Sequence, residues 1–146
     1  MFSEPIKNVM DRNKLVSAPP DTSVEAAARL MAERQVGAVL VVENKRLVGI
    51  ITERDVVFRV VAADRNPRAT RVAEVMTRDP KTLAPDETLG YAMLLMHENG
   101  FRHLPVVDRG EPIGVVSARS ALDPELEEFE AEAQRRRSFR KGGAAA

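Results

Sequence analysis

One pattern occurs twice in this chain, and the duplication limits the folds that the chain can adopt. Residues 19–31, "PPDTSVEAAARLM", align with residues 84–96, "APDETLGYAMLLM", at an offset of 65. At the same offset, "GIITERD" at 49–55 aligns with "GVVSARS" at 114–120, where a serine replaces the final acid. Repeated units of this kind bury their apolar faces against one another. The sequence therefore predicts two copies of one supersecondary unit.

Each copy opens with the same short elements. "IKNVM" at 6–10 matches "VAEVM" at 72–76, now at an offset of 66, and both are expected to be short helices. A brief strand is expected around residues 15–18 and 81–84. An amphipathic helix follows, with apolar residues at the i, i+3, i+4, i+7 spacing of one helix face. Those residues are Val24, Ala27, Ala28 and Met31 in the first copy and Leu89, Ala92, Met93 and Met96 in the second.

The ends of these amphipathic helices are marked by capping signals. Thr22 and Glu25 have the spacing of a capping box, which predicts that the first helix begins there. Glycine adopts the left-handed conformation that often ends a helix, so Gly37 and Gly100 are the expected stops.

A β-hairpin is predicted in each copy, because two β-rich runs flank a short polar turn. "AVLVVE" at 38–43 and "LVGIIT" at 47–52 flank "NKR" in the first copy. "LPVVD" at 104–108 and "PIGVVS" at 112–117 flank "RGE" in the second. The first copy then enters a helix over residues 53–63 that carries Val56, Val57, Val60 and Val61 as its apolar residues.

The fold class that follows is α+β, with two β-α-β-β-α repeats. We place the first repeat at 1–66, the second at 67–123, and a charged helix with a flexible tail at 124–146. "DRNPRAT" at 64–70 is a turn-rich linker between the repeats. Each repeat alone is marginal in size. The two should therefore pack together with pseudo-twofold symmetry, which creates two related clefts between them.

The amino-acid composition argues against several classes of function. The 146 residues include 22 basic and 22 acidic side chains, so no net charge favours nucleic acid or an anionic membrane. No cysteine, two histidines and one tyrosine leave few groups for metal binding or catalysis, so we expect no enzyme. No segment has the apolar length of a signal peptide or membrane span, and a cytoplasmic location is expected.

The phrase "GIITERD" has two interpretations. Thr52 stands where a helix begins, and the free N–H groups and partial positive charge of a helix start suit a phosphate. The Asp55 carboxylate can accept two hydrogen bonds, as from a ribose diol, and Arg54 adds a cation. Gly49 would allow a ligand or backbone to approach closely. However, T-x-x-D is also a capping box that needs no ligand, and the phrase alone favours capping.

Taken together, the tandem unit, the G-h-h-T-x-x-D phrase (h, hydrophobic) and "FRHLPVVD" at 101–108 resemble a pair of CBS (cystathionine beta-synthase) domains over about residues 5–123. The resemblance implies a regulatory module that binds AMP, ADP, ATP, S-adenosylmethionine or a dinucleotide. It also implies a homodimer shaped as a flat disc.

The resemblance assigns residues to two ligand sites. At the first site it places Thr52 and Arg54 near phosphate and Asp55 on ribose. The adenine pocket of that site would be lined by Val16, Ser17, Gly37, Ala38 and Val39. The second site would use Thr82, Leu83, Arg102, His103, Leu104, Pro105, Ser117 and Ser120.

The second site departs from the family pattern at Ser120, which stands where the ribose aspartate is expected. A neutral hydroxyl accepts a weaker hydrogen bond than a carboxylate, and the loss is worth about 1.5–3 kcal/mol. Asp123 comes one helical turn too late to replace it. We therefore expect weaker binding there. Arg102 and His103 could face a phosphate, or could be a solvated strand entry.

The tail, "DPELEEFEAEAQRRRSFRK" at 123–141, reads as a terminal helix. Asp123 would cap it, Pro124 would take the first helical position, and acids precede bases as the helix dipole favours. It is expected to fray into "GGAAA". The alternative is that "RRRSFRK" docks an acidic partner or nucleic acid.

The sequence thus predicts an adenine-nucleotide sensor that transmits its state to an effector protein by shifting between two arrangements. A ligand-free protein-interaction scaffold on the same fold is the alternative. A small enzyme is a third possibility, for which no catalytic group of residues is found.

Overall fold

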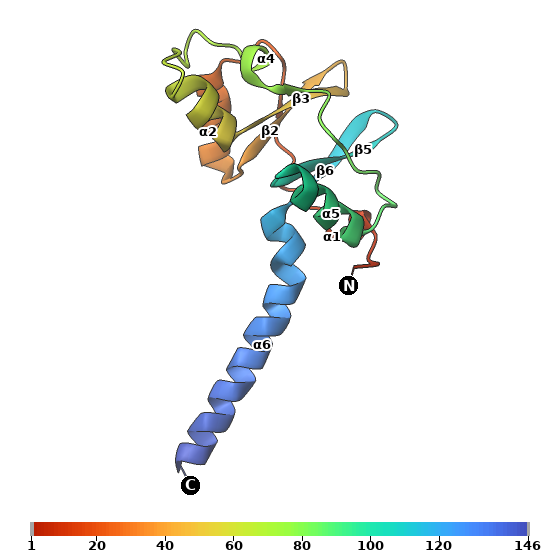
Figure 1. The fold of residues 1–146 in the computed structure, drawn as a ribbon, viewed down its shortest axis with the longest axis vertical. Helices are drawn as coiled ribbons and strands as arrows, with labels where there is room; N and C mark the ends of the chain where they lie inside the picture. Colours follow the sequence, from red (N-terminus) through yellow and green to blue (C-terminus); the bar gives the residue numbers. More distant parts are fainter. Residues whose placement is uncertain (1, 146) are drawn as a thin grey trace.

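The computed structural model describes residues 2–145, except for the side chains of residues 120, 122–128 and 141–145. The chain forms two small sheets with helices packed on them, from which one long helix, α6 (Ala118–Ala145), extends away (Figure 1). The fold is mixed α+β, as the repeat pattern predicts.

The first repeat contributes most of a four-stranded sheet in the order β1-β2-β3-β4, whose last strand, β4 (Thr77–Arg78), pairs antiparallel with β3. β1 (Ser17–Ala18) runs parallel to β2 (Ala38–Glu43), which pairs antiparallel with β3 (Arg46–Thr52). Asn44 and Lys45 both have positive φ, 53° and 66°, in the two-residue turn that joins β2 to β3. Such turns match the twist of hairpin strands, so the predicted hairpin is confirmed.

The second repeat forms the matching hairpin of β5 (His103–Asp108) and β6 (Glu111–Ser117). Arg109 and Gly110 have positive φ in its turn. The strand expected at 81–84 is reduced to a single parallel bridge between Leu83 and Val106.

Helices α2 (Val24–Arg34) and α5 (Leu89–Asn99) are those predicted, but the caps of α2 differ. Ser23, not Thr22, caps α2, because the Ser23 hydroxyl accepts from the Ala26 N–H at 3.1 Å. The Thr22 carbonyl instead accepts from the Val72 N–H. Gln35, with φ of 52°, ends the helix before Gly37 is reached. Gly100 ends α5 as expected, with φ of 68°.

The helix after β3 starts as α3 (Glu53–Asp55) and continues as a π-helical segment, η1 (Val56–Val61). Its wider turn is seen in the hydrogen bond from the Ala62 N–H to the Val57 carbonyl. Val60 is fully buried, whereas Val57 and Val61 are more than half exposed. The predicted apolar face is therefore only partly buried.

The expected start of the terminal helix is wrong. α6 begins at Ala118, directly after β6, so Asp123 is not its cap and Pro124 lies inside it. The reason is the repeat itself, since Ala118 occupies the place at which Glu53 begins α3 in the first copy. The helix also continues through Gly142 and Gly143, where fraying was expected.

The short helices α1 (Ile6–Val9) and α4 (Val72–Val75) are exchanged between the repeats. Val72, Val75 and Met76 belong to the core of the first repeat, with residues such as Val24 and Ile51. Ile6 and Met10 belong to the core of the second, with Leu89 and Leu104 among others. In Figure 1, α1 accordingly lies beside α5.

Gly49 and Gly114, the equivalent glycines of the two hairpins, each lie against a methionine that follows an exchanged helix. A Cβ on Gly49 would overlap the Met76 side chain, and a Cβ on Gly114 would lie 2.7 Å from the Met10 sulfur. The close approach anticipated at Gly49 is therefore that of a methionine. A small apolar cluster joins the sheets between these cores, formed by Ala38, Leu40, Ile50 and Val115.

Candidate functional site

A cleft of about 540 Å³ lies between the two repeats. Gly37 and Ala38 enter β2 on one side, and Arg102 and His103 enter β5 on the other. These are equivalent positions of the two copies, so the cleft lies where the pseudo-twofold brings both strand entries together. The full lining is Asp11, Lys14, Met31, Ala32, Gln35, Val36, Gly37, Ala38, Glu53, Arg102, His103, Val115, Ser117, Ala118 and Arg119.

The same backbone hydrogen bond fixes the cleft wall in both copies. The Glu53 N–H donates to the Gly37 carbonyl at 3.0 Å, and the Ala118 N–H donates to the Arg102 carbonyl at 2.8 Å. Each bond ties the start of a helix to the entry of a strand. Because these anchors are backbone groups, the side chains of Glu53, Arg102 and Ala118 remain available to line the cleft.

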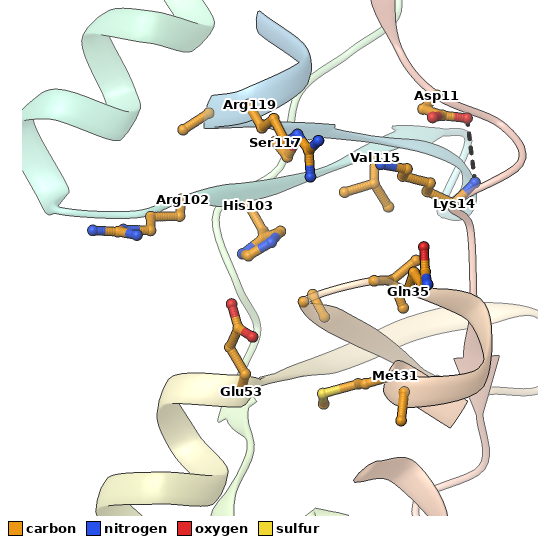
Figure 2. Close-up of a pocket in the computed structure, with 15 residues that line it drawn as sticks. Asp11, Lys14, Met31, Gln35, Glu53, Arg102, His103, Val115, Ser117 and Arg119 are labelled. Carbon is orange, nitrogen blue, oxygen red and sulfur yellow. Dashed lines mark hydrogen bonds between the residues drawn. The ribbon is translucent and has the colours of Figure 1, made fainter. Parts of the chain in front are cut away.

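His103 lines this cleft opposite Gly37. A Cβ added to Gly37 would meet its Nε2 at 2.9 Å and the Glu53 Oε1 at 3.0 Å. Figure 2 shows Glu53 and His103 extending toward one another from opposite repeats. Burial lowers the pKa of His103 below its usual 6.5, the Glu53 carboxylate opposes the shift, and Arg102 adds to it. The imidazole is therefore neutral at pH 7.

Charged side chains of both signs line the cleft, with Lys14, Arg102 and Arg119 as the cations and Asp11 and Glu53 as the carboxylates. Asp11 Oδ1 accepts from the backbone N–H groups of Asn13 (2.9 Å) and Lys14 (3.3 Å), which folds this segment into a turn (Figure 2). The cations come from three separate segments of the chain.

Thr52 and Asp55 form a capping box with each other. The Thr52 N–H and hydroxyl donate to Asp55 Oδ2 at 2.9 and 3.1 Å, and the Asp55 N–H donates to the Thr52 hydroxyl at 3.3 Å. Asp55 Oδ1 lies 3.6 Å from the Arg59 Nε. The capping interpretation is confirmed. Neither residue is among those that line the cleft, and their ligand roles stay a prediction.

The other residues assigned by resemblance are distributed over several places. Arg54 is exposed and stacks over the Phe58 ring at 5.2 Å. Ser17 is exposed on β1, and Thr82 lines a smaller cavity of about 230 Å³ with Arg46 and Asp79. The side chain of Ser120 lies outside the described residues. Those with buried side chains are Val16, Val39, Leu83, Leu104 and Pro105.

The structure therefore brings together Gly37, Ala38, Arg102, His103 and Ser117 from the two predicted sites. Sequence reasoning missed four charged lining residues. Glu53 and Arg119 lie within the two copies of the repeated phrase, and the pattern assigned them no role. Asp11 and Lys14 follow an exchanged helix, and no local signal points to them.

A family model for the CBS domain matches residues 6–62 and 72–124. The chain belongs to the CBS-domain family. CBS-domain pairs are generally regulatory rather than catalytic. The CBS domain-containing protein CBSCBSPB5 of Arabidopsis thaliana is 37% identical over 134 residues, which cover 91% of this chain but only 23% of that protein. The chain thus spans about a quarter of that relative's length.

Solved structures of CBS proteins share the fold. A putative signal-transduction protein from Burkholderia ambifaria is 35% identical, with a TM-score of 0.77 over 84% of this chain and 91% of the other. CBSX2 in complex with AMP is 26% identical, with a TM-score of 0.72 over 86% and 98%.

No helix among the described residues is both long and apolar enough to cross a membrane. Nor do they contain a cluster of three or more His, Asp or Glu side chains that could hold a metal ion.

Proposed function

We propose that this protein is a regulatory module that binds an adenosine-containing ligand between its two repeats and passes the bound state to a partner protein. The observation that carries the proposal is the cleft at the paired strand entries, with cations from three segments. AMP, ADP, ATP and S-adenosylmethionine are the candidate ligands. The AMP complex of CBSX2, which has the same fold, supports the adenosine class.

The lining suggests a role for each kind of group. Lys14, Arg102 and Arg119 would bind phosphate, since charge-assisted hydrogen bonds are about twice as strong as neutral ones. Gly37 would leave room for the base, because it adds no side chain between His103 and Glu53. Asp55 does not line the cleft, and its role as acceptor of ribose hydroxyls, through oxygen lone pairs that Thr52 does not use, rests on the family resemblance alone. The predicted weaker second site at Ser120 stays part of this proposal.

A ligand in this cleft would contact both repeats at once. It would therefore favour the arrangement of the repeats to which it binds more tightly, and it can shift that equilibrium only by its difference in affinity. We include in the proposal a homodimer, a cytoplasmic location, an effector protein that reads the arrangement, and no catalytic role.

Isothermal titration calorimetry with AMP, ADP, ATP, S-adenosylmethionine and NAD tests the proposal. We expect one of them to bind the wild type, and Arg102→Ala to weaken it roughly tenfold or more, since a hydrogen bond to a charged group is worth about 1.5–3 kcal/mol. Arg29→Ala, an exposed arginine on α2 outside the cleft, is the matched control and should bind normally. Asp55→Asn tests the ribose assignment.

The alternative is a scaffold that binds no nucleotide. A folded wild-type sample that gives no binding heat with any of the five ligands would reject the sensor and support the scaffold. Direct binding is the better measurement here, because removing the Asp55 cap would cost about 0.5–2 kcal/mol of stability with or without a ligand.

A further inference from the structure

The part of α6 beyond residue 128 carries the two most exposed aromatic side chains among the described residues. Phe129 is 69% exposed and Phe139 is 83% exposed. α6 extends away from both sheets, so this part of the helix has no cover from the rest of the chain (Figure 1). Burying a phenylalanine ring that is otherwise in water is favourable. The two rings are therefore available for a contact with another molecule.

Charge is divided along the same helix. Residues 123–132 contain six acids and no base, in the sequence "DPELEEFEAE", whereas 135–141 contain five bases and no acid, in "RRRSFRK". A second α6 lying antiparallel would place each acidic half against a basic half. A parallel copy would place like charges together, which is unfavourable.

We propose that α6 pairs antiparallel with α6 of a second copy of this chain. Phe129, Glu132, Arg136 and Phe139 follow one another at spacings of three, four and three residues, which is the seam of paired helices. In a pair centred on Gln134, Phe129 packs on Phe139 of the second copy. Glu132 faces Arg136 of the second copy in the same register. A single register therefore packs the phenylalanine rings on one another and places opposite charges face to face.

Ion pairs within α6 already hold the Glu132 and Arg136 side chains near one another. Glu132 binds Arg136 at 3.2 Å and Arg135 at 3.0 Å within the helix, and the Glu132 side chain is still 49% exposed. In the antiparallel pair, the glutamate and arginine of each copy form a four-membered network between two pairs of aromatic rings. A nucleic acid or an acidic protein fits less well, because the acidic half of the helix adjoins the basic half and repels a polyanion.

A pair of charge-reversal variants of the full chain tests the pairing. Glu132→Arg and Arg136→Glu each place like charges across the seam, so the association constant measured by sedimentation velocity should fall roughly tenfold, or about 1.4 kcal/mol. An equimolar mixture of the two variants restores opposite charges in both layers and should associate as the wild type does. Circular dichroism checks that both variants keep their helix content.

Two matched controls change the same charges on a neighbouring face of α6. Glu130 and Arg137 lie outside the seam and are exposed. The control variants are Glu130→Arg and Arg137→Glu. Both should sediment as the wild type does.

Orientation is read from engineered disulfides, which is direct because the chain has no cysteine. A mixture of Phe129→Cys and Phe139→Cys chains should form the mixed disulfide in preference to either homodimer.

Any of four results would overturn the pairing. These are a wild type that does not associate, variants 132 and 136 that associate normally, controls that are equally impaired, or disulfides only between identical positions. Salt-sensitive binding of an RNA duplex or a poly-glutamate peptide by a wild type that does not self-associate would assign the basic segment to such a partner.

Discussion

The Asp55 carboxylate finds its hydrogen-bond and ion-pair partners within the helix to which it belongs. One carboxylate oxygen accepts two hydrogen bonds from Thr52, and the other faces Arg59. The helix start therefore needs no ligand to be stable, although lone pairs remain for one. His103 differs from Asp55 in this respect. It is partly buried between the repeats, and this burial disfavours the charged form of the imidazole.

The pH dependence of stability should reveal the cost of charging the imidazole. The pKa of His103 is lowered by folding, so below about pH 6.5 the unfolded chain binds more protons than the folded one. The free energy of unfolding should therefore fall as the pH drops from 7 through 6.5 toward the lowered pKa. His103→Gln should lack this part of the decline in urea titrations at pH 7.5, 6.5 and 5.5.

His97→Gln, on the exposed part of α5, is the control and should keep the wild-type dependence, because the cleft is untouched. Identical pH profiles for wild type and His103→Gln would contradict the assignment of this cost to His103. Removal of the opposing carboxylate by Glu53→Gln should lower the pKa of His103 further, as measured by its NMR titration.

At the scale of elements, sequence periodicity located most helices and hairpins. The hairpins and Gly100 follow from local turn chemistry, which a short stretch specifies fully. The cap at Ser23 was missed because the Thr22 carbonyl is engaged by α4, a distant segment. The start of α6 was missed because Asp123 and Pro124 imitate a helix beginning, whereas the preceding strand sets the actual start.

Gly49→Ala should destabilise the protein by about 1–3 kcal/mol in chemical denaturation, because its methyl group would overlap the Met76 side chain. Alanine otherwise suits a strand at least as well as glycine, so the cost isolates the contact. Met76→Ala removes the overlap. In the double variant the Gly49→Ala step should therefore cost much less than it does alone, and equal costs in both backgrounds would refute the contact.

At the scale of the whole molecule, the sequence predicted only some of the residues that line the cleft. Resemblance identified Gly37, Ala38, Arg102 and His103, which lie where the equivalent strands β2 and β5 begin. Asp11 and Lys14 depend on the exchange of α1, which is a matter of packing between distant segments. No periodicity within a repeat could have located them.

The exchange also predicts cooperative unfolding. Ile6 is fully buried in the core of the second repeat, so Ile6→Ala should cost about 2–5 kcal/mol. Both sheets should still melt in one transition, because each core contains a segment from the other half of the chain. Probes in the two repeats, such as hydrogen exchange at Leu40 and Val106, should shift together. Loss of protection in the second repeat alone would show that the halves are independent.

The exchanged helices also set an order of events during synthesis. Ile6 is synthesised well before the side chains that enclose it, from Leu83 to Val116. The first repeat likewise awaits Val72 and Met76 before its own core is closed. Helix α1 thus cannot pack into its core until nearly all of the second hairpin has emerged, and a nascent chain would leave α1 exposed to chaperones until then.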